Sequence, residues 1–306
     1  NVPEKVDKIP STLNWDLFTG PAKMNPYNAI YHPWNWRGWW DYGTGALGDM
    51  ACHILHQPFK ALKLQYPTKV EGSSTLLLNA CAPQAQHVKM IFPARENMPK
   101  VAMPEVEIHW YDGGLMPPRP EELKDGQMMG DENGGIIFIG TKGKIMTGCY
   151  GMNPTLLPVS DMEHFNQPKP TIPRVKGGNG DIWSTNAHEQ DWIRACKESP
   201  ENRTEASSNF QFSGPFNEMV VMGVLAVRLS GLQGLHRELQ WDGENMRFTN
   251  ISPNDKIKIV TVDDFKVIDG DPRFDRRFAE FNAAEMANEW IKHTYNNGFS
   301  LPDMPR

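Results

Sequence analysis

The chain has 306 residues and a formal net charge of −6, with 31 basic and 37 acidic residues mixed along its length. This balance leaves no basic stripe for a nucleic acid, and no stretch reaches the roughly 18 apolar residues that would span a bilayer. The 4 cysteines stand far apart without a C-x-x-C pair, which indicates neither a zinc site nor a disulfide framework.

The N-terminal segment, residues 1–35, is rich in Pro and Asn. It predicts an extended arm in which Trp15, Asp16 and Leu17 dock on the body. It contains no apolar signal region, and any targeting segment would precede residue 1, so the sequence predicts no compartment.

An aromatic loop follows the arm and runs through three glycines into a helix. Gly43, Gly45 and Gly48 match G-x-G-x-x-G, which in dinucleotide-binding domains places backbone N–H groups around a pyrophosphate. That pattern needs a Val/Ile-rich buried strand before its first glycine, whereas residues 36–42 are bulky and interrupted by polar groups. We therefore predict a tight loop whose backbone passes close to the neighbouring tryptophans, rather than a dinucleotide site.

The helix is predicted over residues 46–64, with a kink or an end at Pro58. Asp49 and His53 are four residues apart on its polar side, so both can act on one small molecule. A carboxylate that fixes the tautomer of an imidazole forms an acid–base pair, and a solvated polar surface is the alternative. The predicted core side consists of Leu47, Met50, Ala51, Ile54 and Leu55.

Four tryptophans in the same stretch favour a sugar as ligand. Aromatic faces stack on the C–H face of a sugar, while polar neighbours bind its hydroxyls. Packing in the core or the loop is the alternative for each ring. The four are Trp34, Trp36, Trp39 and Trp40.

Strands with turn signals between them are predicted over residues 69–80, 88–92, 105–111, 135–139 and 144–147. They indicate an α+β fold with a large, mostly antiparallel open sheet and helices packed on one face. The loop from Gly113 to Gly134 is either a lid or partner surface, or a surface excursion.

The second half of the chain predicts three further helices. Residues 151–185 are rich in Pro and Gly and predict irregular structure, followed by a helix over 184–197 with Ala187, Trp192 and Ala195 on its apolar side. Residues 216–229 are apolar nearly all round and predict a helix against the sheet, capped by Arg228. Residues 272–293 predict a polar helix.

Ordered motifs resemble the C-terminal, substrate-binding domain of the glucose-fructose oxidoreductase / inositol dehydrogenase / MocA family of NAD(P)-dependent oxidoreductases. The resemblance spans about residues 10–255 and is greatest to the bacterial branch with an enlarged C-terminal domain. The matching runs are residues 34–55 (WNWRGWWDYGTGALGDMACHIL), 110–114 (WYDGG), 117–120 (PPRP), 138–144 (FIGTKGK), 148–151 (GCYG), 188–197 (HEQDWIRACK) and 241–246 (WDGENM).

The resemblance implies the chemistry of the helix. In the family a D-x-x-x-H pair on the first helix of this domain serves the substrate. His53 would remove a proton from a sugar hydroxyl as hydride leaves its carbon, and Asp49 would orient His53 or bind a neighbouring hydroxyl. His56 stands where relatives often carry an acid, and its role stays open.

The resemblance also assigns the cofactor. NAD or NADP would be bound mainly by an N-terminal Rossmann domain whose glycine turn and Glu-Lys-Pro lysine are not found in this chain. We therefore expect the chain to be a substrate domain that is inactive alone.

Further site residues are predicted with the resemblance. Arg37 would donate hydrogen bonds to substrate or cofactor phosphate, with a cation–π clamp on the tryptophans as the alternative. Trp36, Tyr111 and Asp112 would form pocket walls, and His188 is a weaker candidate that is also typical of a surface histidine.

The expected organisation is an arm (residues 1–35), a substrate-binding domain (36–262) and a C-terminal helical extension (263–306) that packs on the domain or a partner subunit. A homo-oligomer through the sheet face is expected, with a sugar or cyclic polyol as substrate.

Three alternatives stay open. An NAD-dependent glycosidase would oxidise a sugar carbon transiently to permit elimination. The chain could instead be a non-catalytic carbohydrate-binding or oligomerisation module. A metal-dependent hydratase or lyase would use Asp49, His53 and His56 as ligands.

Overall fold

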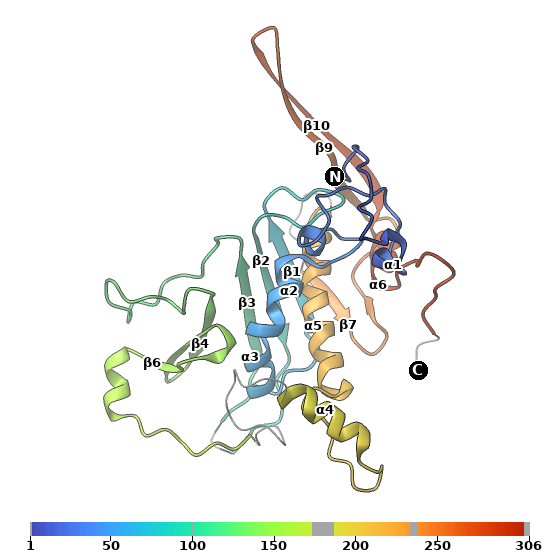
Figure 1. Cartoon of the computed structure of the whole chain (residues 1–306). Helices are drawn as coiled ribbons and strands as arrows, with labels where there is room; N and C mark the ends of the chain where they lie inside the picture. Colours follow the sequence, from blue (N-terminus) through green and yellow to red (C-terminus); the bar gives the residue numbers. More distant parts are fainter. Residues whose placement is uncertain (1, 100, 173–186, 233–237, 303–306) are drawn as a thin grey trace. The chain divides into compact units, whose positions relative to one another are not determined.

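The computed structural model describes residues 2–99, 101–172, 187–232 and 238–302 (Figure 1). The chain divides into two compact units: Asn1–Arg119 with Met219–Arg306, and Pro120–Glu218. Helices and antiparallel strands occur in both, which confirms the predicted α+β class.

The first unit is built on a five-stranded sheet in the order β3-β2-β1-β7-β8, and its strand pairs are antiparallel. In β2, Val88, Met90 and Phe92 are fully buried, because alternate side chains share one face of a strand. The strands are β1 (Lys69–Ser74), β2 (Gln86–Phe92), β3 (Val106–Asp112), β7 (Leu239–Asp242) and β8 (Arg247–Phe248).

Two helices cover the buried face of this sheet, α2 (Gly45–Ile54) and the C-terminal part of α5 (Phe210–Arg228) (Figure 1). A Cβ at Gly223 would stand 2.6 Å from Leu47 Cδ2 on α2 and 2.7 Å from Met90 Cε on β2. The three elements therefore meet at this glycine, and the predicted helices on one face of the sheet are confirmed.

The helix predicted over residues 46–64 is observed as two segments, α2 and α3 (His56–Ala61). The break lies at Leu55, because Pro58 has no N–H to donate to the carbonyl four residues earlier. The predicted core side is confirmed, since Leu47 and Ala51 are fully buried and Leu55 nearly so.

The N-terminal arm docks through Trp15, as predicted. Trp15 is buried in the short helix α1 (Trp15–Thr19) and donates a 2.8 Å hydrogen bond to Asn25 O within the arm, and its ring lies edge-on 5.9 Å from that of Tyr42 in the body. Leu17 was predicted to dock with it, but its side chain is 77% exposed, because the helical turn points positions 15 and 17 in different directions.

The predicted strands pair in antiparallel fashion as expected, but they divide between two sheets. Residues 135–157 form a separate three-stranded sheet in the second unit, with strands β4 (Gly135–Gly140), β5 (Gly143–Gly148) and β6 (Thr155–Leu157). Hydrophobic alternation predicts a strand but not the sheet that it joins, since pairing partners are set by distant contacts.

The segment predicted to be irregular, residues 151–185, contains the end of η2 (Cys149–Gly151), β6 and η3 (Val159–His164) before α4 (Ala187–Lys197) begins. Residues 173–186, which include the predicted start of that helix at 184, lie outside the described residues. On α4, Ala195 is buried, but Trp192 is exposed and Asp191 takes the buried place, so the predicted apolar side is wrong in part.

The helix predicted over residues 272–293 is wrong in its first half. Residues 256–282 form a long hairpin of β9 (Lys256–Ile268) and β10 (Asp271–Asn282), and α6 spans only Ala283–Ile291. Asp269 and Gly270 adopt positive φ angles of 53° and 86°, which reverse the chain in a tight hairpin turn. Residue 263, where a helical extension was expected to begin, therefore lies inside a strand.

Arg228 was predicted to cap α5, but its guanidinium lies over the ring of Trp290 at 3.9 Å and that of Trp40 at 5.1 Å. Burial lowers the pKa of Arg228 to about 10, although Asp41 opposes the shift. The two indole faces stabilise the cation and hold α5 between the aromatic loop and α6.

Among the described helices, none is both long and apolar enough to cross a membrane.

Candidate functional site

Arg37 is fixed where the aromatic loop meets α2. It lies in η1 (Asn35–Gly38), with its guanidinium 3.6 Å from the ring centre of Trp34 and 5.2 Å from that of Trp36. Its Nη1 donates a 2.7 Å hydrogen bond to Trp34 O, and its Nε lies 3.3 Å from Asp49 Oδ2. The predicted cation–π clamp is present, and it holds the cation beside the helix that carries Asp49.

Asp49 and His53 lie one turn apart on the exposed side of α2, as their spacing predicts. The contact shown for the Asp49 carboxylate is the ion pair with Arg37, whose side chain is 25% exposed while that of Asp49 is 39% exposed. The ion pair joins Arg37 to Asp49, and His53 lies one helical turn further along α2. A solvent-screened pair of this kind contributes little stability.

The space beside the Cα atom of each of the three loop glycines is filled by other atoms of this chain. A Cβ at Gly43 would lie 2.4 Å from Arg37 O, and one at Gly48 would lie 1.7 Å from Thr44 Oγ1. Gly45 has a φ of +68°, and its Cβ would lie 2.7 Å from Ala82 Cβ. The close approach is confirmed, but it is to these groups and not mainly to the tryptophans.

The same loop does not fit a dinucleotide. A turn and the 3₁₀ segment η1 precede α2 where the fingerprint needs a strand, and the N–H of Gly43 already donates a 2.7 Å hydrogen bond to Trp39 O. The rejection of a dinucleotide site at Gly43 to Gly48 is consistent with this geometry.

The four tryptophans divide into two pairs. Trp39 packs 4.9 Å from the ring of Tyr31 in the N-terminal cluster, and Trp40 contacts Arg228. Trp34 is 66% exposed and Trp36 is half-buried, and both contact Arg37. Stacking of a sugar ring therefore remains a prediction for Trp34 and Trp36, whereas the other pair serves packing.

Tyr111 and Asp112 cannot be walls of one pocket as predicted, because neighbours in a strand point to opposite faces. Asp112 shares its face with Trp110 and accepts 2.6 Å and 2.7 Å hydrogen bonds from Trp110 Nε1 and Gln86 Nε2. Tyr111 lies on the other face, with its ring 4.6 Å from that of His87. Asp112 thus satisfies two donors that sit on the helix-covered face, and Tyr111 belongs to the open face.

Sequence reasoning missed a cluster on that open face. The rings of His87 and His109 stack 5.1 Å apart, and a 2.9 Å hydrogen bond joins His87 Nε2 to His109 Nδ1. Burial and the neighbouring His109 lower the pKa of His87, although Glu71 opposes the shift. The period-2 spacing of His87 and Lys89, and of Glu107 and His109, was the signal available in the sequence.

Residues 2–92 match the family model described as "Oxidoreductase family, C-terminal alpha/beta domain". The match confirms the predicted resemblance over this segment. It includes Arg37, Asp49 and His53, together with the aromatic loop and strands β1 and β2. Within this range the chain is similar to the C-terminal domain of an oxidoreductase family. No curated protein matches the chain.

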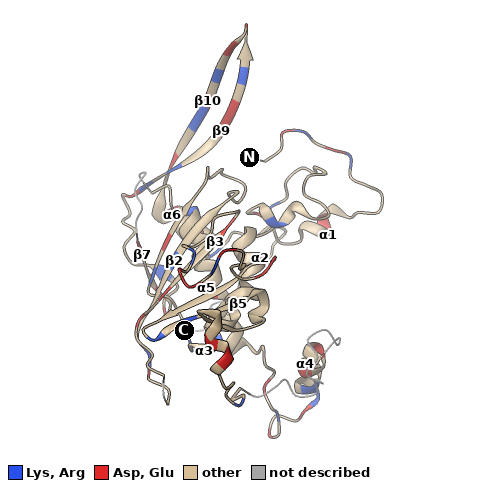
Figure 2. Cartoon of the chain, turned by 90° about the vertical axis from the view of Figure 1, so that its left-hand side faces the viewer, with Lys and Arg blue, Asp and Glu red and all other residues tan. Residues whose placement is uncertain are grey.

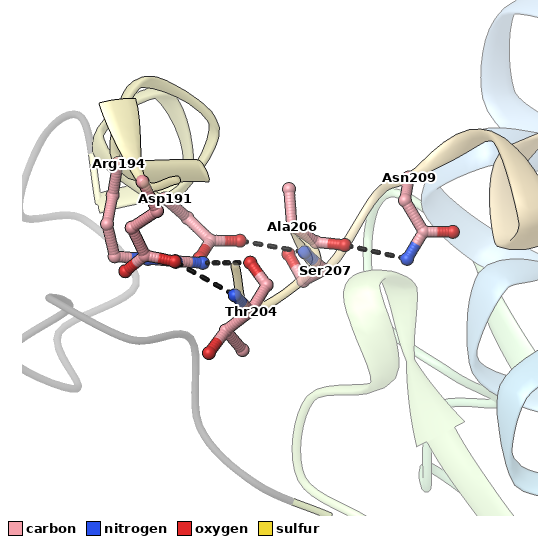
Figure 3. Close-up of polar contacts among 7 residues, drawn as sticks. Asp191, Arg194, Thr204, Ala206, Ser207 and Asn209 are labelled. Carbon is pink, nitrogen blue, oxygen red and sulfur yellow. Dashed lines mark hydrogen bonds and ion pairs between the residues drawn. The ribbon is translucent and has the colours of Figure 1, made fainter. Parts of the chain in front are cut away.

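The second unit carries the HEQDWIRACK motif as a polar clamp rather than an open site (Figure 3). Asp191 is 3% exposed, with Oδ1 2.8 Å from Arg194 Nη2 and Oδ2 accepting a 2.7 Å hydrogen bond from Ser207 N. Arg194 also reaches Thr204 O at 3.1 Å. These bonds tie the loop after α4 to the helix. His188, the weaker site candidate, lies exposed on α4 with Nε2 3.2 Å from Ser208 Oγ.

Asp191→Asn is expected to lower the free energy of unfolding of the second unit by about 2 kcal/mol, since a hydrogen bond to a charged group is lost. Burial opposes ionisation of Asp191, but the hydrogen bonds from Arg194 and Ser207 outweigh it and hold the pKa below its ordinary value of 3.8. This contribution is therefore present above pH 3.8 and is lost as the pH falls through the lower folded value. Hydrogen exchange of residues 198–209 in both proteins, at pH 7 and pH 3, measures it; equal protection at pH 7 would contradict the role.

Cavities are also lined by residues outside α2. One of about 790 Å³ lies within the second unit, with apolar walls that include Ile145, Leu156 and Phe165. One of about 520 Å³ lies in the first unit between Tyr66, Arg95 and Trp241. Neither was predicted from the sequence. Among the described residues no group of three His, Cys, Asp or Glu side chains is arranged to hold a metal ion.

Proposed function

We propose that this chain binds a sugar or cyclic polyol for an NAD(P)-dependent oxidoreductase, with His53 as proton acceptor. The observation that carries the proposal is the grouping of Arg37, Asp49 and His53 at the exposed end of the aromatic loop, inside the segment that matches the oxidoreductase family. Trp34 and Trp36 offer apolar ring faces beside these polar groups, the combination that suits a sugar.

In this proposal Arg37 and Asp49 bind substrate hydroxyls, and His53 accepts the hydroxyl proton as hydride leaves the same carbon. Because the ion pair is already formed, the two groups need little reorganisation when the substrate binds. The nicotinamide that takes the hydride is bound mainly by another domain, and this chain handles the substrate and the proton. His188 and Tyr111 are not needed for this grouping.

Calorimetric titration of the chain with monosaccharides and inositols tests the substrate class. Trp34→Ala is expected to weaken binding about tenfold, which corresponds to the roughly 1.4 kcal/mol of one aromatic stacking contact. Trp192→Ala is a matched control, because both tryptophans are 66% exposed and Trp192 lies on α4. Equal weakening by both variants, or binding of no member of the panel, would contradict the proposal.

Two alternative functions predict different outcomes. A glycosidase that uses bound NAD transiently would cleave a glycoside without net formation of NADH. A carbohydrate-binding or oligomerisation module would bind sugar or its own copies equally well after His53 is replaced. Loss of kcat on replacement of His53 separates the module from the leading proposal, and net formation of NADH during turnover separates the glycosidase.

A further inference from the structure

The outer half of the β9–β10 hairpin, residues 263–277, is an amphipathic ribbon, here named the distal arm. Residues paired across an antiparallel ladder share a face, so Phe265 and Phe274 lie together, as do Val267 and Pro272 beside them. The two phenylalanine rings lie 5.0 Å apart. Phe265 is 55% exposed and Phe274 is 82% exposed, so one face of the arm is apolar and open.

The opposite face of the distal arm is charged and internally paired, apart from Ile268 near the turn. Lys266 Nζ lies 2.9 Å from Asp264 Oδ2, and Arg277 Nη2 lies 2.5 Å from Asp275 Oδ2. Figure 2 shows basic and acidic residues following one another along both strands. The two faces thus differ as the buried and solvated faces of a packed sheet do.

Contacts with the rest of the first unit are made at the base of the hairpin. Lys258 N donates a 3.2 Å hydrogen bond to Gly231 O, and isolated bridges join Ile257 to Leu232 and Val260 to Leu78. Among the described residues, the hydrogen bonds and ion pairs of residues 262–277 stay within the hairpin. A two-stranded ribbon is marginally stable in water without further packing, so the arm requires a partner.

We propose that the phenylalanine face of the distal arm docks on the same face of a second copy of this chain. The arm has 5 aspartates and 4 basic residues, a sum of −1, so it offers no net charge to a nucleic acid or an anionic membrane. At the base of the apolar face Asp263 and Arg276 form a 2.7 Å ion pair. When a two-fold axis brings the pairs of two copies together, Asp263 of each copy faces Arg276 of the other. The face is therefore self-complementary in charge.

The exposed area is sufficient for a reversible dimer. Two aromatic rings exposed to this degree present roughly 300 Å² per arm, and with Val267, Pro272 and the rim two arms bury about 1,000 Å², the lower bound for a specific interface. The expected dimer is therefore a weak one. This inference does not depend on the proposed catalytic function.

Light scattering coupled to size exclusion, over a series of increasing protein concentrations, tests the inference on the full chain. The wild-type mass is expected to rise with concentration to 69.4 kDa, twice the chain mass of 34.7 kDa, or to a higher even multiple, and Phe265→Ser with Phe274→Ser is expected to halve that limiting mass. Both side chains are exposed, so the variant is expected to keep the circular dichroism of the wild type.

The matched control is Lys266→Gln with Arg273→Gln on the opposite face, where the side chains are 63% and 65% exposed. This control is expected to keep the wild-type mass. A monomeric wild type would overturn the inference and leave the face to another protein or a membrane. An oligomer whose mass is unchanged in the phenylalanine variant would overturn it as well, because assembly would then use another surface such as the open face of the five-stranded sheet.

Discussion

Replacing His53 by alanine in the active enzyme is expected to lower kcat by about 10² to 10⁴-fold, the usual contribution of one positioned general base. His53 is exposed on α2 one turn from Asp49, whose carboxylate is held by Arg37. Removal of an exposed imidazole leaves the helix core of Leu47, Ala51 and Leu55 untouched. The loss should therefore appear in kcat, with little change in the affinity for substrate or NAD(P)H.

Single-turnover and steady-state measurements on purified enzyme separate these effects. His164→Ala is the control, because His164 is an exposed histidine of η3 in the second unit. Added imidazole should restore part of the activity of the His53 variant, since a small base can occupy the space of the deleted ring. An unchanged kcat in the His53 variant would remove this residue from the mechanism and favour a non-catalytic binding module.

Gly72→Ala is expected to lower the free energy of unfolding by about 3 kcal/mol, the upper range for overpacking a tight core. Gly72 lies in β1 where α5 crosses the sheet, and a Cβ there would stand 2.5 Å from both Ala226 C and Val227 N. These are backbone atoms of a buried helix, so they cannot rotate away. The whole end of α5 must shift from the sheet.

Two other glycines provide graded controls in the same helix. The closest atoms to a Cβ at Gly223 are the ends of the Leu47 and Met90 side chains rather than backbone, so a smaller loss of roughly 1 kcal/mol is expected for Gly223→Ala as these side chains repack. Gly214 has nothing within 4 Å of its Cβ position apart from its chain neighbours, but it precedes Pro215, whose ring disfavours helical backbone at a residue with a Cβ, so alanine there is expected to bring no gain in stability. Urea unfolding followed by tryptophan fluorescence ranks the three, and a Gly72 variant as stable as the Gly223 variant would show that β1 and α5 are not closely packed.

The predictions that succeeded depended on short-range periodicity. The core side of α2 follows from apolar residues at helical spacing, and the burial of α5 follows from a run that is apolar nearly all round. Strands β2 and β3 were found from alternation over a few residues. In each case neighbours along the chain decide which face is buried, so no distant contact was needed.

The predictions that failed depended on the position of a chain reversal or on which residues lie across the sheet. Phe274 and Phe278 have helical spacing, but the turn at Asp269 and Gly270 commits the segment to strand pairing with β9. From the sequence Asp112 was predicted to be an acid in the pocket wall, but its carboxylate accepts hydrogen bonds from Trp110 and Gln86. A side chain's neighbours across a sheet cannot be derived from its own strand.

For the candidate site the division is similar. That Asp49 and His53 share one side of a helix beside an aromatic loop follows from their spacing, because four residues make about one helical turn. The contacts across the fold do not follow from spacing: Arg37, clamped by Trp34 and Trp36, turns back to pair with Asp49, and Tyr111 lies on the face of the sheet opposite to Asp112. Local periodicity determines on which side of the helix a side chain lies. The loop that returns over the helix determines which residue contacts that side chain, as Arg37 contacts Asp49.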